Sequence, residues 1–280
     1  MEKIQEKTYD EERALYNSDS IIVENCRFDG PKDGESALKE SKNIVVNNSY
    51  FNLRYPFWHD NNIEINNCEL TENCRAALWY SQNIKVNKSI LNGIKAFREC
   101  SKIEIQNTKM VSPEEFWNCS DIKIDNSNID SMYFLMRSSN IVIKDAEFKG
   151  KYSFQYVNNL DIKDSNLDTK DAFWHSNNVT VENSTIKGEY LGWYSNGLTL
   201  KNCTIIGTQP LCYAKNLKII NCKFEKADLA FEYSEVEADI IGEVISVKNP
   251  ISGYINADKI GEVILENSKY DCNCKIKSKQ

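Results

Sequence analysis

Short segments in which apolar and polar residues alternate recur along the chain, as in Ile63-Glu64-Ile65 and Ile103-Glu104-Ile105. This period of two predicts β-strands with one buried face. When the first apolar residue of each segment is called position zero, ten of the twelve intervals between successive zeros are nineteen residues long. The sequence therefore predicts a repeat protein built on a nineteen-residue coil. The zeros fall at Ile21, Ile44, Ile63, Ile84, Ile103, Ile122, Ile141, Leu160, Val179, Leu198, Leu217, Val236 and Ile255.

Residues at one offset from position zero form a column with shared chemistry. Positions two and seven are apolar, position five is small, and the column six residues before zero is apolar. Position four is mostly asparagine, which tolerates the left-handed backbone of a sharp turn. Stacked at a strand spacing of about 4.8 Å, these amides are expected to bond one another as a ladder. They are Asn25, Asn48, Asn67, Asn107, Asn126, Asn183, Asn202 and Asn221.

The columns predict an all-β fold, a single-stranded right-handed parallel β-helix of about thirteen coils with three short strands each. One domain is expected over residues 1–280, with an N-terminal cap (1–13), coils (14–268) and a C-terminal tail (269–280). Left-handed β-helices run on hexapeptide repeats, of which nineteen is not a multiple. Leucine-rich repeats need another leucine-to-asparagine spacing, and helical repeats need a 3.6-residue period, so both fit worse.

Two neighbouring columns, five and four residues before zero, differ from the rest. All five tryptophans lie in the minus-five column and both histidines in the minus-four column. Because the apolar minus-six column must point inward, strand alternation predicts that the minus-five column points outward. The minus-five column contains Tyr16, Lys39, Trp58, Trp79, Arg98, Trp117, Met136, Gln155, Trp174, Trp193 and Cys212. The minus-four column contains Asn17, Glu40, His59, Tyr80, Glu99, Asn118, Arg137, Tyr156, His175, Tyr194 and Tyr213.

These columns predict an exposed aromatic strip flanked by hydrogen-bonding groups, a surface suited to a carbohydrate or protein partner. In this interpretation the tryptophan faces stack on sugar rings and the neighbouring polar groups bond the hydroxyls. The alternative is that the tryptophans stack on one another as part of the scaffold. The residues expected to contact a ligand are Lys39, Trp58, His59, Trp79, Tyr80, Arg98, Glu99, Trp117, Asn118 and Arg137.

Three side chains of the minus-four column, Glu40, His59 and Glu99, are candidate catalytic residues. They lie on nearby coils, where carboxylates and an imidazole can act as general acid and base. The alternative is an ion-pair network on the flank of the solenoid. The sequence contains no phosphate loop, dinucleotide fingerprint or HExxH motif, so no cofactor and no metal are expected.

The formal net charge is −7 and the isoelectric point is about 5.1. An acidic chain repels phosphate backbones, so no nucleic-acid partner is expected. The first residues lack the apolar run of a signal peptide, and no segment is apolar enough to span a membrane. The ten cysteines are then expected to be reduced thiols. These features predict a cytoplasmic protein without a membrane partner, and they leave the oligomeric state open.

The asparagine ladder and the inward aliphatic columns resemble the pectin-lyase-like right-handed β-helix superfamily over nearly the whole chain. Residues 12–16 (ERALY), 33–40 (DGESALKE) and 54–59 (RYPFWH) are similar to a bacterial family of unknown function within it. The resemblance implies the fold but no established activity. The Gly-His-Gly element of polygalacturonase-like hydrolases is absent, and Asp29 and Asp33 are too isolated for the calcium site of pectate lyases.

Taken together, these observations favour a non-catalytic β-helix that binds a carbohydrate or protein partner. The second hypothesis is a carbohydrate-active enzyme, a hydrolase, lyase or isomerase, that uses the acidic residues and histidine of the same strip. The third is a structural scaffold with no small ligand.

Overall fold

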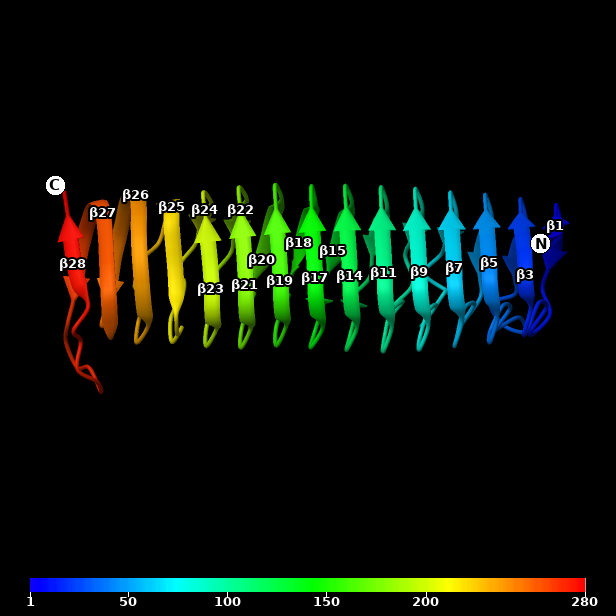
Figure 1. Cartoon of the computed structure of the whole chain (residues 1–280), viewed down its shortest axis with the longest axis horizontal. Coiled ribbons are helices and arrows are strands. Elements are labelled where there is room, and N and C mark those ends of the chain that lie inside the picture. The colour runs from blue at the N-terminus through cyan, green and yellow to red at the C-terminus, as the bar shows by residue number, and fades with distance from the viewer. Residues whose placement is uncertain (280) are drawn as a thin grey trace. The chain divides into compact units, whose positions relative to one another are not determined.

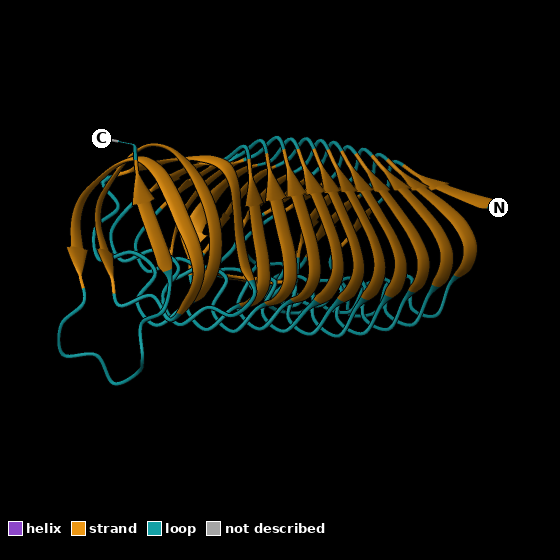
Figure 2. Cartoon of the chain, turned by 60° about the vertical axis from the view of Figure 1, so that its left-hand side comes forward, coloured by secondary structure: helices purple, strands orange, loops and turns teal. Residues whose placement is uncertain are grey.

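The computed structural model describes residues 1–279, which form strands and loops but no helix (Figure 2). The chain divides into two compact units, Met1–Ile141 (unit 1) and Val142–Gln280 (unit 2). Each unit is a parallel β-solenoid with a repeat of about nineteen residues, which confirms the predicted fold class. Among the described residues there is no helix with the length and hydropathy needed to cross a membrane.

Unit 1 contains two rows of parallel strands, one from each of two segments of the coil (Figure 1). The register pairs Ile63 with Ile84 and Ile84 with Ile103, so that the predicted zeros superpose. The first row consists of β1 (Glu2–Gln5), β3 (Asp19–Glu24), β5 (Lys42–Asn47), β7 (Asn61–Asn66), β9 (Gln82–Asn87), β11 (Ser101–Gln106) and β14 (Ser120–Asp125). The second row consists of β2 (Thr8–Tyr9), β4 (Arg27–Asp29), β6 (Tyr50–Asn52), β8 (Glu69–Leu70), β10 (Ile90–Leu91), β12 (Lys109–Val111) and β15 (Asn128–Ser131).

Unit 2 repeats this arrangement, and the strand β17 (Ser139–Lys144) contains the boundary between the units. Its zeros also superpose, since Leu160 pairs with Val179 and Val179 with Leu198. The first row consists of β19 (Asn158–Lys163), β21 (Asn177–Glu182), β23 (Asn196–Lys201) and β25 (Leu217–Glu225). The second row consists of β18 (Glu147–Lys151), β20 (Asn166–Lys170), β22 (Thr185–Lys187) and β24 (Thr204–Ile206). The last strands are β26 (Glu235–Lys248), β27 (Ser252–Ile264) and β28 (Lys275–Ser278).

The predicted columns are reproduced in the core and at the corners. Aliphatic side chains at zero and two are buried throughout, where β-branched residues suit a pleated surface. The position-four asparagines adopt the left-handed conformation, with φ of 49° at Asn48 and 50° at Asn67. The Asn67 amide donates to Asn48 at 3.3 Å, and the Asn126 amide donates to Asn107 at 2.6 Å. The predicted asparagine ladder is therefore confirmed.

Both ends of the chain contain strands where a cap and a tail were expected. β1 and β2 pair in parallel with β3 and β4, and β28 pairs with β27. These strands add turns to the solenoid of their own unit, and the chain has about 15 turns rather than thirteen.

Only two of the three strands predicted for each coil are regular in most coils. The third segment forms turns, and its one regular strand pair in the described part of the chain is β13 (Glu114–Glu115) with β16 (Tyr133–Phe134). Left-handed residues such as Tyr55 and His59 flank this segment and interrupt the strand. The coils are still hydrogen-bonded there, for example from the Phe57 N–H to the Ala77 carbonyl at 2.8 Å.

The register of the last coils differs from the prediction. The sequence Ile-Gly-Glu-Val-Ile occurs at residues 241–245 and again nineteen positions later at 260–264, yet Ile260 pairs with Val244 and not with Ile241. Val236 pairs with Gly253 rather than with Ile255. These coils lack an asparagine corner, so β26 and β27 run as long strands of 14 and 13 residues with a register shift between Ile240 and Glu243.

Candidate functional site

The tryptophans of the minus-five column in unit 1 are half-buried, and Trp58 and Trp79 stack on each other. The Trp58 and Trp79 ring centroids lie 5.6 Å apart, and their planes are inclined by 6°. The Lys39 ammonium lies 5.7 Å from the Trp58 ring centre, and the Arg98 guanidinium lies 5.1 Å from the Trp79 ring centre. Neighbouring side chains thus contact these ring faces, and the prediction that the faces stack on sugar rings is not supported by this geometry.

Each indole N–H in this column also has a backbone partner. Trp58 donates to the Ala76 carbonyl at 2.5 Å, and Trp79 donates to the Lys95 carbonyl at 2.6 Å. Trp117 makes the same kind of bond at 3.2 Å to the Tyr133 carbonyl. The tryptophan layer therefore ties successive coils together and is part of the scaffold.

The minus-five column does not point outward along its whole length. Gln155 and Cys212 in this column are buried. Strand alternation was the basis of the prediction, but the column lies in a turn where left-handed residues such as Tyr156 and Tyr213 follow it. Alternation of side chains does not hold at such corners.

The minus-four column forms the exposed layer of unit 1. Glu40, His59, Tyr80, Glu99 and Asn118 all have left-handed backbones, with φ between 53° and 63°. All five are open to solvent, and Tyr80 is 43% exposed. Arg137 has the same backbone conformation and is exposed on the next coil. The repeated corner therefore presents one outward side chain per coil in this column.

Contacts along the minus-four column leave polar edges directed to solvent. The Tyr16 hydroxyl donates to Glu40 at 2.6 Å. The His59 and Tyr80 rings stack with centroids 4.9 Å apart. The Asn118 amide donates to Glu99 at 2.9 Å. A ligand approaching from solvent meets ring edges, carboxylate oxygens and amides in a single row.

The three candidate catalytic residues share this column but not one coil. Glu40 and His59 lie on neighbouring coils, and Tyr80 occupies the coil between His59 and Glu99. Three strand spacings therefore separate the two carboxylate positions, about 14 Å at about 4.8 Å per coil. Their catalytic role stays a prediction.

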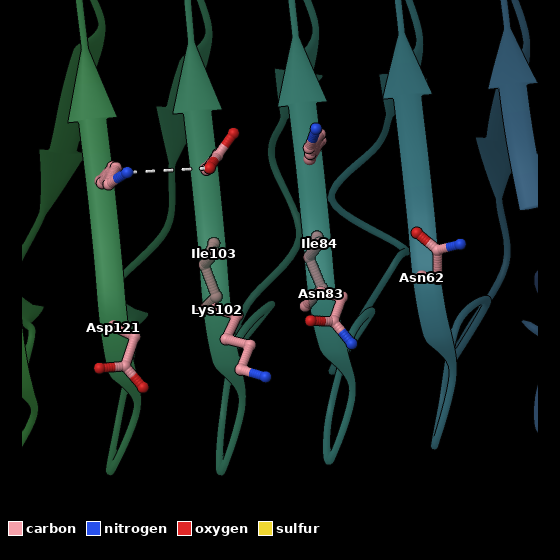
Figure 3. Close-up of a pocket in the computed structure, with 9 residues that line it drawn as sticks. Asn62, Asn83, Ile84, Lys102, Ile103 and Asp121 are labelled. Atoms are coloured by element: carbon pink, nitrogen blue, oxygen red, sulfur yellow. Dashed lines mark ion pairs between the residues drawn. The ribbon is translucent and has the colours of Figure 1, made fainter. Parts of the chain in front are cut away.

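A hollow of about 350 Å³ lies on the first strand row beside the centre of this column (Figure 3). The close-up shows Asn62, Asn83, Lys102 and Asp121 projecting from successive strands at its edge. Each follows a minus-four residue by three positions, for example Lys102 after Glu99. The remaining lining residues are Ile84, Lys85, Ile103, Glu104 and Lys123.

The four edge residues belong to a second ladder, at position minus one, which the sequence analysis missed. Asparagine is frequent at this position, and its left-handed backbone, with φ of 62° at Asn62 and 56° at Lys102, parallels position four. The Asn62 amide donates to Asn43 at 2.8 Å, and that of Asn140 donates to Asp121 at 3.0 Å. The recurrence of asparagine at minus one was the available signal.

Lysine interrupts this ladder within the hollow. Lys102 replaces the asparagine, and among the described residues neither its ammonium nor that of Lys85 has an acidic partner. Lys123 lies 4.0 Å from Glu104. The hollow therefore offers two unpaired ammonium groups together with amide oxygens. The polar face of unit 1 is defined as Glu40, His59, Tyr80, Glu99 and Asn118 together with Asn62, Asn83, Lys85, Lys102 and Asp121.

Behind the polar face lies a buried carboxyl group. Asp60 is 1% exposed and occupies a column that is mostly serine. Its Oδ1 accepts the Ser41 N–H at 2.8 Å, whereas its Oδ2 has no partner. Burial raises the pKa of Asp60 to about 9, so this group is protonated at neutral pH. It is not placed to exchange protons with a ligand at the surface.

Unit 2 has the same two columns with more aromatic side chains. Trp174 and Trp193 stack with centroids 5.4 Å apart. Outside them, Tyr156, His175 and Tyr194 stack at 5.0 Å per step. In the described residues no group of three or more histidine, cysteine, aspartate or glutamate side chains is arranged to hold a metal ion.

Comparison with protein families gives a match over residues 2–277 to a family described as "Protein of unknown function (DUF3737)". This match confirms the predicted resemblance to an uncharacterised family. No curated protein sequence matches the chain.

Solved structures give distant likenesses. A surface adhesin of Streptococcus pneumoniae, PfbA, is 13% identical with a TM-score of 0.44, over 78% of this chain and 71% of that chain. A mannuronic acid specific polysaccharide family 6 lyase from human gut microbiota is 7% identical with a TM-score of 0.43, over 96% and 84%. The A-module of the Azotobacter vinelandii mannuronan C-5 epimerase AlgE4 is 9% identical with a TM-score of 0.30, over 98% and 80%. Likenesses this low do not bear on what this chain binds.

Proposed function

We propose that this chain, which belongs to the DUF3737 family of proteins of unknown function, binds an extended glycan along the polar face of unit 1. One observation carries the proposal. Exposed hydrogen-bonding side chains repeat once per coil from Glu40 to Asn118, on corners with the same left-handed backbone. The sheet fixes their spacing at about 4.8 Å, so the row is rigid and linear.

A linear, hydroxyl-rich polymer complements such a row. Glycan hydroxyls both donate and accept, which matches the carboxylates of Glu40 and Glu99 and the amide of Asn118. The edges of the His59 and Tyr80 rings add polar atoms beside apolar carbon. Ligand sites are typically concave, and the hollow at Lys102 can bury part of the glycan away from solvent.

The geometry favours binding over hydrolysis. Glu40 and Glu99 are separated by about three strand spacings, or about 14 Å, whereas the paired carboxylates of glycosidases lie about 5–10 Å apart. Each of the two also accepts a hydrogen bond from a neutral neighbour, Tyr16 and Asn118 respectively. These contacts suit fixed acceptors that hold hydroxyl groups in place.

The test is a panel of soluble glycans, with titration calorimetry of each one retained by the full chain. We expect Tyr80→Ala and Lys102→Met each to lower the affinity for the tightest-binding glycan by about tenfold, which corresponds to the loss of one good polar contact. The matched control is Tyr194→Ala, which alters the same column in unit 2 and is expected to leave the affinity unchanged.

Two results contradict the proposal. One is that no glycan in the panel is retained at millimolar concentration. The other is that Tyr194→Ala weakens binding as much as Tyr80→Ala does, because the polar face of unit 1 is then not the contact surface. Retention of a protein partner together with rejection of every glycan also overturns the glycan assignment.

A further inference from the structure

Two of the ten cysteines, Cys272 and Cys274, differ from the other eight in their burial. The other eight are buried inside the coils. Cys272 and Cys274 are half-exposed and lie in residues 265–274, a fully described segment that joins β27 to β28 without forming a strand. These two sulfur atoms are therefore the ones that a reagent dissolved in water can reach.

The spacing of the two cysteines allows a bond between them. Only Asn273 separates them, and Cα atoms two positions apart lie within about 7 Å of each other. Disulfides form across Cα separations of about 4.4–6.8 Å when the two Cβ atoms turn toward each other. A paired strand resists such a turn, whereas residues 271–274 have no strand pairing to lose.

Cys272 has hydrogen-bonding neighbours that suit a thiolate. Its Sγ lies 3.3 Å from the Ser268 hydroxyl oxygen and 3.6 Å from the Tyr270 carbonyl oxygen. The Ser268 hydroxyl donates to the same carbonyl at 2.7 Å, and it can rotate to donate to the sulfur when the thiol ionises. The thiolate is the reactive form of cysteine, and a hydrogen bond to the charged form favours it. Cys272 is thus placed to be the attacking sulfur.

Cys274 is suited to the second step of a disulfide-forming reaction. Burial and the charge of Cys272 raise the pKa of Cys274 to about 11, so Cys274 stays protonated while Cys272 reacts. The effect of one sulfur on the other also means that the two groups are close in space. Once Cys272 has become a neutral sulfenic acid, its charge is gone and Cys274 ionises more readily.

We propose that Cys272 and Cys274 are a site of reversible oxidation, at which a peroxide converts the two thiols into one disulfide. The Cys272 thiolate attacks a peroxide oxygen, so that an S–O bond forms, the O–O bond breaks and the second oxygen leaves as water after taking up a proton. The Cys274 sulfur then attacks the Cys272 sulfenic acid. The S–S bond forms, the S–O bond breaks and a second water leaves. Each sulfur loses one electron and the peroxide gains both, and a dithiol reverses the reaction by thiol–disulfide exchange.

The experiment treats the full, reduced chain with hydrogen peroxide, blocks the remaining thiols with N-ethylmaleimide after unfolding and digests the product with trypsin. Residues 270–275 (YDCNCK) form one tryptic peptide that contains both cysteines. We expect this peptide to lose two hydrogen atoms and to escape the maleimide. Dithiothreitol is expected to restore both thiols, and the eight buried cysteines are expected to be recovered with the maleimide attached.

Variants assign the two steps. Cys274→Ser is expected to stop at the sulfenic acid of Cys272, which dimedone labels. Ser268→Ala is expected to lower the rate of oxidation about threefold, because one hydrogen bond to the thiolate is lost. The matched control is Cys203→Ser, which installs the residue common at position five and is expected to be oxidised at the same rate as the wild type.

Three results overturn the inference, with circular dichroism establishing that each protein is folded before peroxide is added. One is that the peptide 270–275 stays reduced at millimolar peroxide. Another is that the disulfide joins two chains or includes a buried cysteine. The third is equal dimedone labelling of Cys272→Ser and Cys274→Ser, because Cys272 is then not the attacking sulfur.

Discussion

The minus-four column has the same backbone conformation in both units but different side chains. In unit 1 it presents Glu40, His59, Tyr80, Glu99 and Asn118, of which only His59 and Tyr80 stack. In unit 2 it is a continuous ring stack, which ends with Tyr194 and Tyr213 at 4.8 Å. The corners have the same left-handed φ in both units. The fold therefore fixes the position of each side chain. The residue type decides whether that side chain stacks on its neighbour or directs polar groups to solvent.

The layer beneath does not differ in this way. Trp58 and Trp79 in unit 1 and Trp174 and Trp193 in unit 2 stack with almost parallel planes, at 6° and 4°. In both units the indoles donate to backbone carbonyls, as Trp79 does at 2.6 Å and Trp193 at 2.8 Å. The comparison assigns the inner layer to the scaffold in both units and confines the difference to the outermost side chains.

The largest expected effect concerns a third column, at minus three, where unit 1 has Asp60 and unit 2 has Ser176 and Ser195. The pKa of Asp60 is raised from 3.8 to about 9 by burial. At a pH between 3.8 and about 9, Asp60 is protonated in the folded state and ionised in the unfolded state. The free energy of unfolding therefore falls by about 1.4 kcal/mol per pH unit as the pH rises through this range. The stabilising contribution of protonated Asp60 is fully present only below the unfolded-state pKa of 3.8. Asp60→Asn is expected to remove this slope and to stabilise the protein by about 2–4 kcal/mol at pH 7.

Urea unfolding followed by circular dichroism from pH 5 to pH 8.5 measures this slope. Asp60→Ser, which installs the residue common in the column, is the control and is expected to lose the slope as well. A wild-type protein whose stability rises with pH over this range, with Asp60→Asn unchanged from it, contradicts the assignment of a protonated buried acid.

The next effect tests whether the tryptophan layer is scaffold in both units. Trp79→Ala and Trp193→Ala are each expected to lower the free energy of unfolding by about 2–3 kcal/mol. Each removes a half-buried stacked ring and leaves a backbone carbonyl without its donor. Urea unfolding monitored by circular dichroism gives both values.

Phenylalanine at the same positions separates the two contributions, because it keeps a ring and removes only the N–H donor. About half of the loss is expected for Trp79→Phe. If Trp79→Ala leaves the stability unchanged while glycan binding disappears, the layer is a recognition surface in unit 1 and the comparison between the units fails.

Much of this fold could be predicted because a fixed offset in a solenoid becomes a spatial column. The inward zeros and the asparagine ladder at position four followed from the spacing alone, as the contact of Asn67 with Asn48 shows. The last coils do not keep residues at one offset in one column, since Ile260 pairs with Val244. These coils lack the position-four asparagine corner that fixes the register in the other coils. A repeat of sequence, Ile-Gly-Glu-Val-Ile, does not impose a register by itself.

The site was harder to predict than the fold for a local reason. Strand alternation was applied to Trp58 and Trp79, but they lie in a segment flanked by left-handed residues, where successive side chains do not simply alternate. The second ladder was missed because polar residues at the start of a strand, such as Asn62 and Lys102, look like ordinary solvent-facing positions. The recurrence of asparagine at this offset was a sequence signal for a corner, and the left-handed backbone shows the corner itself.

The smallest expected effect compares the outermost layers directly. Tyr194 stacks between His175 at 5.0 Å and Tyr213 at 4.8 Å, so Tyr194→Ala is expected to lower the free energy of unfolding by about 1 kcal/mol. Glu99 has one amide donor and no ring contact, so Glu99→Ala is expected to stay within about 0.5 kcal/mol of the wild type. Tyr194→Phe keeps the stack and serves as the control in the same urea titration. Equal losses for Glu99→Ala and Tyr194→Ala mean that the outer layer of unit 1 is as structural as that of unit 2, which removes the reason to assign recognition to unit 1.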